Sequence, residues 1–159
     1  MTKEVKQQFT LRITQANSTE LVVILYEMAL SFLQDAKDAG QKQEWTEFKE
    51  SIRKTRGCIN ELMQSLHMEY EPAKSLFKLY MFCIRRLAYS QVRREVQVLD
   101  EVESVLCKLH DAYAKIAPNN SSAPVMSNTQ TVYSGLTYGK GASLTEDVTG
   151  QSSNRGMFV

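Results

Sequence analysis

The sequence predicts an all-α protein: an antiparallel up-down four-helix bundle with a short N-terminal cap segment and a flexible C-terminal tail. Helix-breaking residues supply the first observation. Before residue 118 only Gly40, Gly57 and Pro72 interrupt the chain, whereas five of the seven glycines come later. The second observation is that apolar residues recur at steps of three and four, as in amphipathic helices. The predicted parts are a cap segment (1–16), a bundle (17–117) and a low-complexity tail (118–159).

The cap segment is a short amphipathic stretch. Val5, Phe9 and Ile13 recur every four residues, so their side chains share one face of a helix. This apolar face predicts that the segment lies against the bundle.

The first long helix is predicted to begin at Asn17. Asn17 and Glu20 have the spacing of a capping box, in which each side chain accepts a hydrogen bond from the other residue's backbone N–H. Gly40 is predicted to end this helix. Between them, apolar residues recur at helical spacing: Leu21, Leu25, Met28, Phe32 and Ala36.

The second helix carries one apolar stripe and an internal glycine. Gly57 lowers helix stability by up to about 1 kcal/mol relative to alanine, so we expect it to mark a close contact between helices. The stripe comprises Trp45, Phe48, Ile52, Ile59, Leu62 and Leu66.

Two further helices complete the predicted bundle. Pro72 suits the first turn of the third helix, where its missing N–H costs nothing. A polar break at residues 93–95 precedes the fourth helix. The apolar stripe of the third comprises Leu76, Tyr80, Cys83, Ile84 and Leu87, and that of the fourth Leu99, Val102, Leu106, Leu109, Tyr113 and Ile116. Four such helices with short connections are typical of an antiparallel bundle.

The tail has a different composition. It opens with the linker-like PNNSSAP and is rich in Ser, Thr, Asn and Gly. Such a composition favours disorder, because it buries too little apolar surface to offset the entropy of ordering. The alternative is that its few apolar residues dock on the bundle: Tyr133, Leu136, Tyr138, Leu144 and Phe158.

Composition narrows the class of protein. A formal net charge of +1 provides no field that would attract nucleic acid or an anionic membrane. Cys58, Cys83 and Cys107 lie within apolar helical patterns, which favours buried, reduced thiols in a cytosolic protein. The N-terminus lacks the apolar core of a signal peptide, and no apolar run approaches the roughly 20 residues that span a bilayer. We therefore expect no membrane insertion.

The sequence predicts neither an enzyme nor a cofactor. His67 and His110 are the only histidines, and neither follows a glutamate at the spacing of a di-iron bundle. Cys107 and His110 have helical spacing, but no second pair of metal ligands accompanies them. Phosphate-binding glycine loops and nucleophile elbows are also absent from the sequence.

A nucleic-acid interface is the alternative suggested by one basic cluster. Arg86, Tyr89 and Arg93 share a helix stripe that suits phosphate contact and base stacking. Acidic residues follow at once, from Glu95 to Glu103, so the cluster is interpreted as a solvated helix end and no nucleic-acid partner is predicted.

Two helices carry more apolar residues than a bundle core can absorb. Residues 21–33 are apolar at eleven of thirteen positions and residues 76–89 at eleven of fourteen, against about three in seven for a core-facing helix. The surplus is covered by the chain's own ends, by a second copy, or by a partner helix in a groove. We predict a partner, bound by Val22, Leu25, Tyr26, Ala29, Leu33, Leu76, Tyr80, Ile84 and Leu87.

The segment ITQANSTELVVILYEMALSFLQDA (13–36) resembles the opening of the flagellin export chaperones, the FliS family, with its V-x-T-A-S-P, a leucine and then M-L-Y-D-G-A. LYMFCIRRL (79–87) resembles the family's L-Y-x-Y-x-x-R-R-L, and LDEVESVLCKLHDAY (99–113) resembles its last helix. The resemblance spans about residues 5–117. The sequence departs from the family pattern at Ser18 (usually Pro), Met28 (Gly), Phe82 (Tyr) and Tyr113 (Trp).

The resemblance implies a four-helix bundle that binds the C-terminal helical segment of flagellin. Such a chaperone prevents premature polymerisation and delivers flagellin to the flagellar export apparatus. The cap residues Val5, Phe9 and Ile13 are then expected to compete with the client. On this hypothesis Tyr80→Glu weakens binding while helicity stays near normal. The alternative function is a dimeric helical-bundle adaptor or regulator that does not take flagellin.

Overall fold

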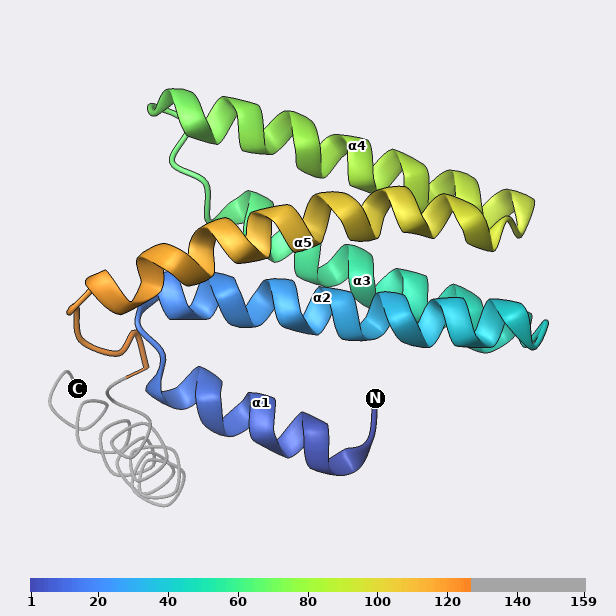
Figure 1. Ribbon diagram of the computed structural model, residues 1–159, viewed down its shortest axis with the longest axis horizontal. Coiled ribbons are helices and arrows are strands. Elements are labelled where there is room, and N and C mark those ends of the chain that lie inside the picture. Colours follow the sequence, from blue (N-terminus) through green and yellow to red (C-terminus); the bar gives the residue numbers. More distant parts are fainter. Residues whose placement is uncertain (127–159) are drawn as a thin grey trace, which may run out of the picture. The chain divides into compact units, whose positions relative to one another are not determined.

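The computed structural model describes residues 1–126, of which Met1–Val125 form one compact unit. This unit contains five α-helices (Figure 1): α1 (Lys3–Gln15), α2 (Ser18–Gln41), α3 (Trp45–Gln64), α4 (Glu71–Arg93) and α5 (Leu99–Ile116). Two short 3-10 helices, η1 (Val96–Val98) and η2 (Ala117–Asn119), precede and follow α5. The predicted tail lies outside the described residues from 127 onward.

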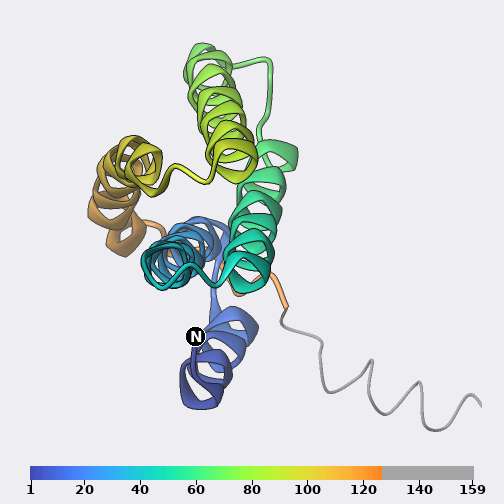
Figure 2. The ribbon, with the colours of Figure 1, turned by 90° about the vertical axis from the view of Figure 1, so that its right-hand side faces the viewer.

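Helices α2 to α5 form the predicted antiparallel up-down bundle (Figure 1). Each packs against its neighbours in sequence, and α5 closes the bundle against α2. Viewed along the helices, α2 and α4 lie diagonally opposite each other, while α1 lies on the side of α2 that faces away from α4 (Figure 2). The fold class predicted from the sequence is confirmed for residues 1–126.

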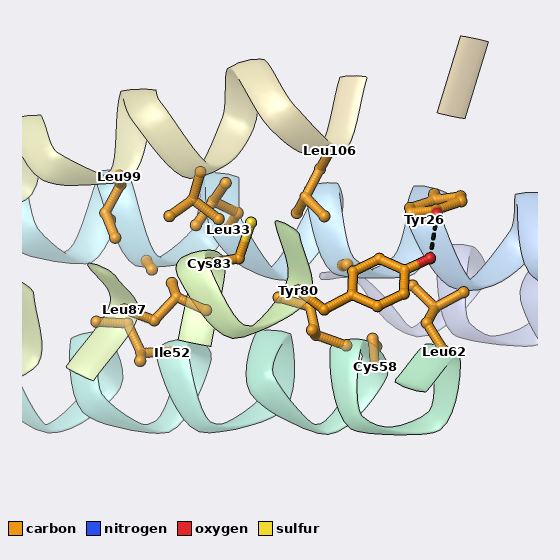
Figure 3. Close-up of a cluster of buried hydrophobic side chains, with 14 of the residues drawn as sticks. Tyr26, Leu33, Ile52, Cys58, Leu62, Tyr80, Cys83, Leu87, Leu99 and Leu106 are labelled. Carbon is orange, nitrogen blue, oxygen red and sulfur yellow. Dashed lines mark hydrogen bonds between the residues drawn. The ribbon is translucent and has the colours of Figure 1, made fainter. Parts of the chain in front are cut away.

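Side chains from all four bundle helices form one apolar core (Figure 3). Tyr26 of α2 and Tyr80 of α4 meet across its diagonal, and their hydroxyls share a hydrogen bond. The other fully buried large apolar side chains are Leu33, Phe48, Ile52, Ile59, Leu62, Leu87, Leu99, Val102 and Leu106. The stripes predicted for the second and fourth helices supply most of these residues.

The predicted start signals of two helices are confirmed. Asn17 and Glu20 form both bonds of the capping box, each with 2.9 Å between nitrogen and oxygen. Pro72 lies in the first turn of α4. Both signals act through backbone groups within one turn, so they do not depend on tertiary packing.

Both glycine predictions are wrong. α2 continues to Gln41, and the left-handed residue in the following turn is Gln43, with φ 60°. Gly40 instead permits close packing: a Cβ there would overlap Cγ2 of Val96 and lie 3.1 Å from the Phe48 ring. Gly57 marks no close contact, because a Cβ there meets nothing within 4 Å.

The same substitution at these two glycines is expected to change stability in opposite directions. The added methyl group of Gly40→Ala would push Val96 and Phe48 away from α2. This should lower the free energy of unfolding by about 1–3 kcal/mol. Gly57→Ala adds helix propensity at an exposed position and should stabilise the fold by about 0.5–1 kcal/mol. Urea unfolding of both variants beside the original chain measures the two effects. Equal shifts for the two variants would contradict this assignment of roles.

Residues 118–125 extend the folded unit beyond the predicted end of the bundle. The sequence places the start of the tail at Pro118, but the compact unit includes residues up to Val125. Asn120 and Val125 form hydrogen bonds with residues at the start of α2 and just before it. Within residues 1–126, no helix is both long and apolar enough to cross a bilayer.

Candidate functional site

The outer face of α2 is covered by α1, which lies along it (Figure 1). Arg12 of α1 donates two hydrogen bonds to the Glu27 carboxylate, and the amino group of Met1 lies 2.6 Å from Asp35 Oδ2. No residue of α1 is buried. Its apolar face, formed by the cap residues Val5, Phe9 and Ile13, is half-buried. α1 is therefore held by a single half-buried stripe and a few ionic contacts.

A cavity of about 590 Å³ lies where the end of α1 meets the bundle. Val23 and Ile24 line it from α2, and both are buried, although they lie outside the continuous core cluster. We call this cavity and its walls the α1–α2 groove. Its remaining lining residues are Arg12, Gln15, Ala16, Glu20, Ala114, Ala117 and Pro118. The groove is thus an apolar surface of α2 that the core does not use.

A second, smaller cleft of about 220 Å³ opens at the α3–α4 connection. Four of its lining residues are Val22, Leu76, Tyr80 and Tyr113. Three of the nine predicted client-binding residues are therefore brought together here. Of these, Val22 and Leu76 remain partly exposed.

Five of the nine predicted client-binding residues are buried in the core and do not lie on an outer face. Helices α2 and α4 lie diagonally across the bundle, so their apolar faces meet in the core instead of forming one outer groove. The five buried residues are Tyr26, Ala29, Leu33, Tyr80 and Leu87. The other four, Val22, Leu25, Leu76 and Ile84, are half-buried against the core. Their contact with a client stays a prediction.

The surplus apolar surface has two different fates. On α2 this apolar surface is covered by α1, as expected if the chain's own ends cover it. On α4 it stays exposed: Phe77, Leu79 and Tyr89 are all more than a third exposed, and Val92 is 81% exposed. Of these two surplus faces, the one on α4 is therefore open without a movement of α1.

Buried titratable groups in the core are held neutral. Burial raises the pKa of Tyr80 to about 12, against the opposing effect of its hydrogen bond with Tyr26. Burial and that same bond raise the pKa of Tyr26. Burial also raises the pKa of Cys83 to about 12 and that of Cys58 to about 11, which makes both thiols poor nucleophiles. Cys107, expected to be buried, is exposed.

The arginines of the basic cluster on α4 contact side chains of the same protein. The guanidinium groups of Arg86 and Arg93 lie 5.2 Å and 6.0 Å from the centre of the Tyr89 ring. Arg86 also pairs with Glu101 of α5. These contacts agree with the interpretation of the cluster as a helix end.

Sequence reasoning missed the walls of the α1–α2 groove. Val23 and Ile24 follow Val22 directly within an unbroken apolar run, so periodicity could not separate them from the core face. The sequence does indicate that a second apolar face exists, because residues 21–33 are apolar at eleven of thirteen positions and the core cannot bury them all. Ala114 and Pro118 carried no signal, because their role depends on the path of the chain after α5.

Acidification is expected to release α1 before it unfolds the bundle. Partial burial raises the pKa of Glu27, but the hydrogen bond and charge of Arg12 outweigh it and hold that pKa below its ordinary value of 4.5. His110, with Nε2 3.6 Å from Glu27, acts in the same direction. A carboxylate with a lowered pKa stabilises the folded form above its ordinary pKa, and this contribution is lost as the pH falls through the lowered value.

An NMR pH titration measures this effect as the chemical shifts of the α1 amides. They should move toward random-coil values below about pH 4.5, while those of α3 stay native. The Glu27→Gln variant should show α1 already loosened at neutral pH and little further change on acidification. An unchanged titration in Glu27→Gln would show that this carboxylate does not control the position of α1.

A family model described as "Flagellar protein FliS" matches residues 1–120. The chain belongs to the FliS family. The flagellar secretion chaperone FliS of Salmonella typhimurium is 30% identical over 112 residues, which cover 69% of this chain and 83% of that protein. The flagellar secretion chaperone FliS of Bacillus subtilis is 27% identical over 101 residues, which cover 64% of this chain and 76% of that protein.

A solved structure supports the same fold. A bacterial flagellar chaperone crystal structure superposes with a TM-score of 0.60 and 22% identity, covering 66% of this chain and 87% of that one. Two departures from the FliS pattern have clear places in this structure. Met28, where the family usually has glycine, is half-buried against the core, and the ring of Tyr113 lies 5.7 Å from that of Tyr26.

Proposed function

We propose that the protein is an export chaperone that binds the C-terminal helical segment of flagellin. It keeps this segment from polymerising in the bacterial cytosol and delivers it to the flagellar export apparatus. Membership of the FliS family and the secretion chaperones among its relatives support this assignment. The proposed activity is binding alone, without catalysis or a cofactor.

The observation that carries the proposal is the way α1 covers α2. A client helix that replaces α1 gains the apolar outer face of α2, including Val23 and Ile24, while the core stays intact. α1 is suited to be displaced because it buries no residue of its own. In this proposal the cap formed by Val5, Phe9 and Ile13 covers α2 alone, and not the faces of α2 and α4 together.

The energies favour such an exchange. Each apolar side chain that a client helix buries contributes about 1.5–3 kcal/mol before ordering costs are subtracted. The half-buried stripe of α1 contributes less per residue, so a client with fully buried anchors displaces it. The exposed apolar residues of α4 offer a second contact for a long client segment.

Calorimetric titration with a peptide covering the C-terminal helical segment of flagellin tests the proposal. Binding should show a negative heat-capacity change, because apolar surface is buried. The matched control is the same peptide with its apolar anchor residues replaced by serine, which should not bind. Equal heats for the two peptides, or no heat for either, would refute the proposed function.

Weakening the cap should strengthen client binding. Phe9→Ala removes an apolar side chain from the half-buried face of α1 and should tighten binding about three- to tenfold, because less energy is needed to displace α1. Leu11→Ala is the control on the same helix, since Leu11 is 61% exposed and should leave the affinity unchanged. Weaker binding by Phe9→Ala would mean that α1 contacts the client directly.

A dimeric helical-bundle adaptor is the second candidate, favoured by the exposed apolar residues of α4. Two copies that pair through Phe77, Tyr89 and Val92, which lie on one side of α4, would cover each other's surface. Light scattering of the isolated chain separates the candidates. A stable dimer that gives no heat with the flagellin peptide would favour the adaptor.

A further inference from the structure

The segment after α5 turns back across the molecule and is attached at the start of α2. Its hydrogen bonds are few and specific: the Asn17 side-chain amide donates to the Asn120 carbonyl at 3.0 Å, and the Asn120 side-chain amide donates to Thr19 Oγ1 at 2.6 Å. The backbone N–H of Val125 donates to the Ala16 carbonyl at 3.0 Å. Apolar burial does not explain this path, because residues 121–125 are all exposed.

These bonds meet at the connection between α1 and α2. Only Ala16 and Asn17 separate the two helices. Both are buried, at 3% and 6% exposure, and both bond to the returning segment. Rotation about the N–Cα bond of Asn17 swings α1 away from α2, and it carries the Ala16 carbonyl along, so it breaks the bond from Val125.

Asn17 has two separate tasks. Its Oδ1 accepts from the backbone N–H of Glu20 and caps α2, while its Nδ2 donates to Asn120. A serine at this position can cap α2 through its hydroxyl oxygen, but it has no amide group that could donate to Asn120. The side chain of Asn17 therefore links the start of α2 to the segment that follows α5.

We propose that residues 117–125 form a latch that holds α1 closed on α2 and so limits access of a client to the α1–α2 groove. The inference rests on the proposed function for the identity of the client, but the latch itself is a property of the free chain. Its closed state is the set of bonds from Asn17, Asn120 and Val125. Breaking them frees the two connecting residues and lets α1 leave without disturbing the core.

Hydrogen exchange of the full chain tests the latch without a client. Asn17→Ser keeps the helix cap and loses the bond to Asn120. Val125→Pro removes the N–H that bonds to Ala16, and its matched control Val125→Ala keeps that N–H. Each latch variant should raise amide exchange in α1 about three- to tenfold, as expected for one hydrogen bond. Exchange at Ala29 and Leu33 in the core should stay unchanged, and Val125→Ala should behave as the original chain.

A second measurement uses the flagellin peptide. Asn17→Ser and Val125→Pro should bind it about three- to tenfold more tightly than the original chain, by the loss of the same bond. Unchanged exchange in α1 for both variants would overturn the latch, whatever the peptide does. Faster exchange in α1 with no peptide binding by any chain would keep the latch and refute the proposed function. Faster exchange with unchanged peptide affinity would overturn the role of the latch in access.

Discussion

Replacing Tyr80 by glutamate is expected to unfold the bundle, and not merely to weaken client binding as the sequence suggests. Tyr80 is 1% exposed, and its hydroxyl is hydrogen-bonded to that of Tyr26 across the core. A glutamate would place a carboxylate among buried apolar side chains at a cost of several kcal/mol. That is a large share of the about 5–15 kcal/mol that stabilises a typical domain. Circular dichroism and urea unfolding measure the loss, and a near-normal urea midpoint would contradict the buried position.

A double-mutant cycle isolates the contribution of the hydroxyl pair. Tyr80→Phe keeps the ring but leaves the Tyr26 hydroxyl buried without its partner, at an expected cost of about 1–3 kcal/mol. Tyr26→Phe should cost a similar amount. Replacing both removes the two polar groups together, so the double variant should be more stable than the sum of the single losses implies. Strict additivity would show that the two hydroxyls do not interact.

Ile24→Glu is expected to abolish most client binding while leaving the bundle folded. Ile24 is 3% exposed and lines the α1–α2 groove, but it lies outside the core cluster. The substitution removes one apolar anchor and places a charge where the client helix would lie, a combined loss of roughly 3 kcal/mol, or about a hundredfold in affinity. Titration with the flagellin peptide measures the loss, and circular dichroism checks that the bundle remains.

The control is Ile24→Val at the same position. It keeps the surface apolar and removes one methylene group, worth about 0.8 kcal/mol, so the affinity should fall no more than about fourfold. If Ile24→Glu binds the flagellin peptide as tightly as Ile24→Val does, the client does not occupy this groove. The surface of α4 would then become the site to examine.

Local features of the fold could be predicted from the sequence. The capping box of Asn17 and Glu20 and the position of Pro72 depend on atoms within one helical turn, and both predictions are confirmed. The same holds for the stripes of α3 and α5, apart from Ile116 at the end of α5, which is 53% exposed. There the spacing alone identifies the buried face.

The residues of the candidate site could not be predicted in the same way, because α2 carries apolar residues around most of its circumference. Periodicity selected Leu25 and Met28, whereas the fully buried face is formed by Tyr26, Ala29 and Leu33. Which face turns inward depends on the helices packed against it, and a sequence with apolar residues all round does not specify this. Gly40 illustrates the same limit: its closeness to Val96 arises only once η1 crosses the end of α2.

The two-residue connection between α1 and α2 has a consequence for how a client departs. In the proposed exchange, a displaced α1 would stay covalently attached beside its docking face, at an effective concentration of about millimolar. Once the client leaves, α1 would therefore rebind without a diffusional search. The apolar face of α2 is open to solvent only briefly, so an emptied chaperone is protected from aggregating with other emptied copies.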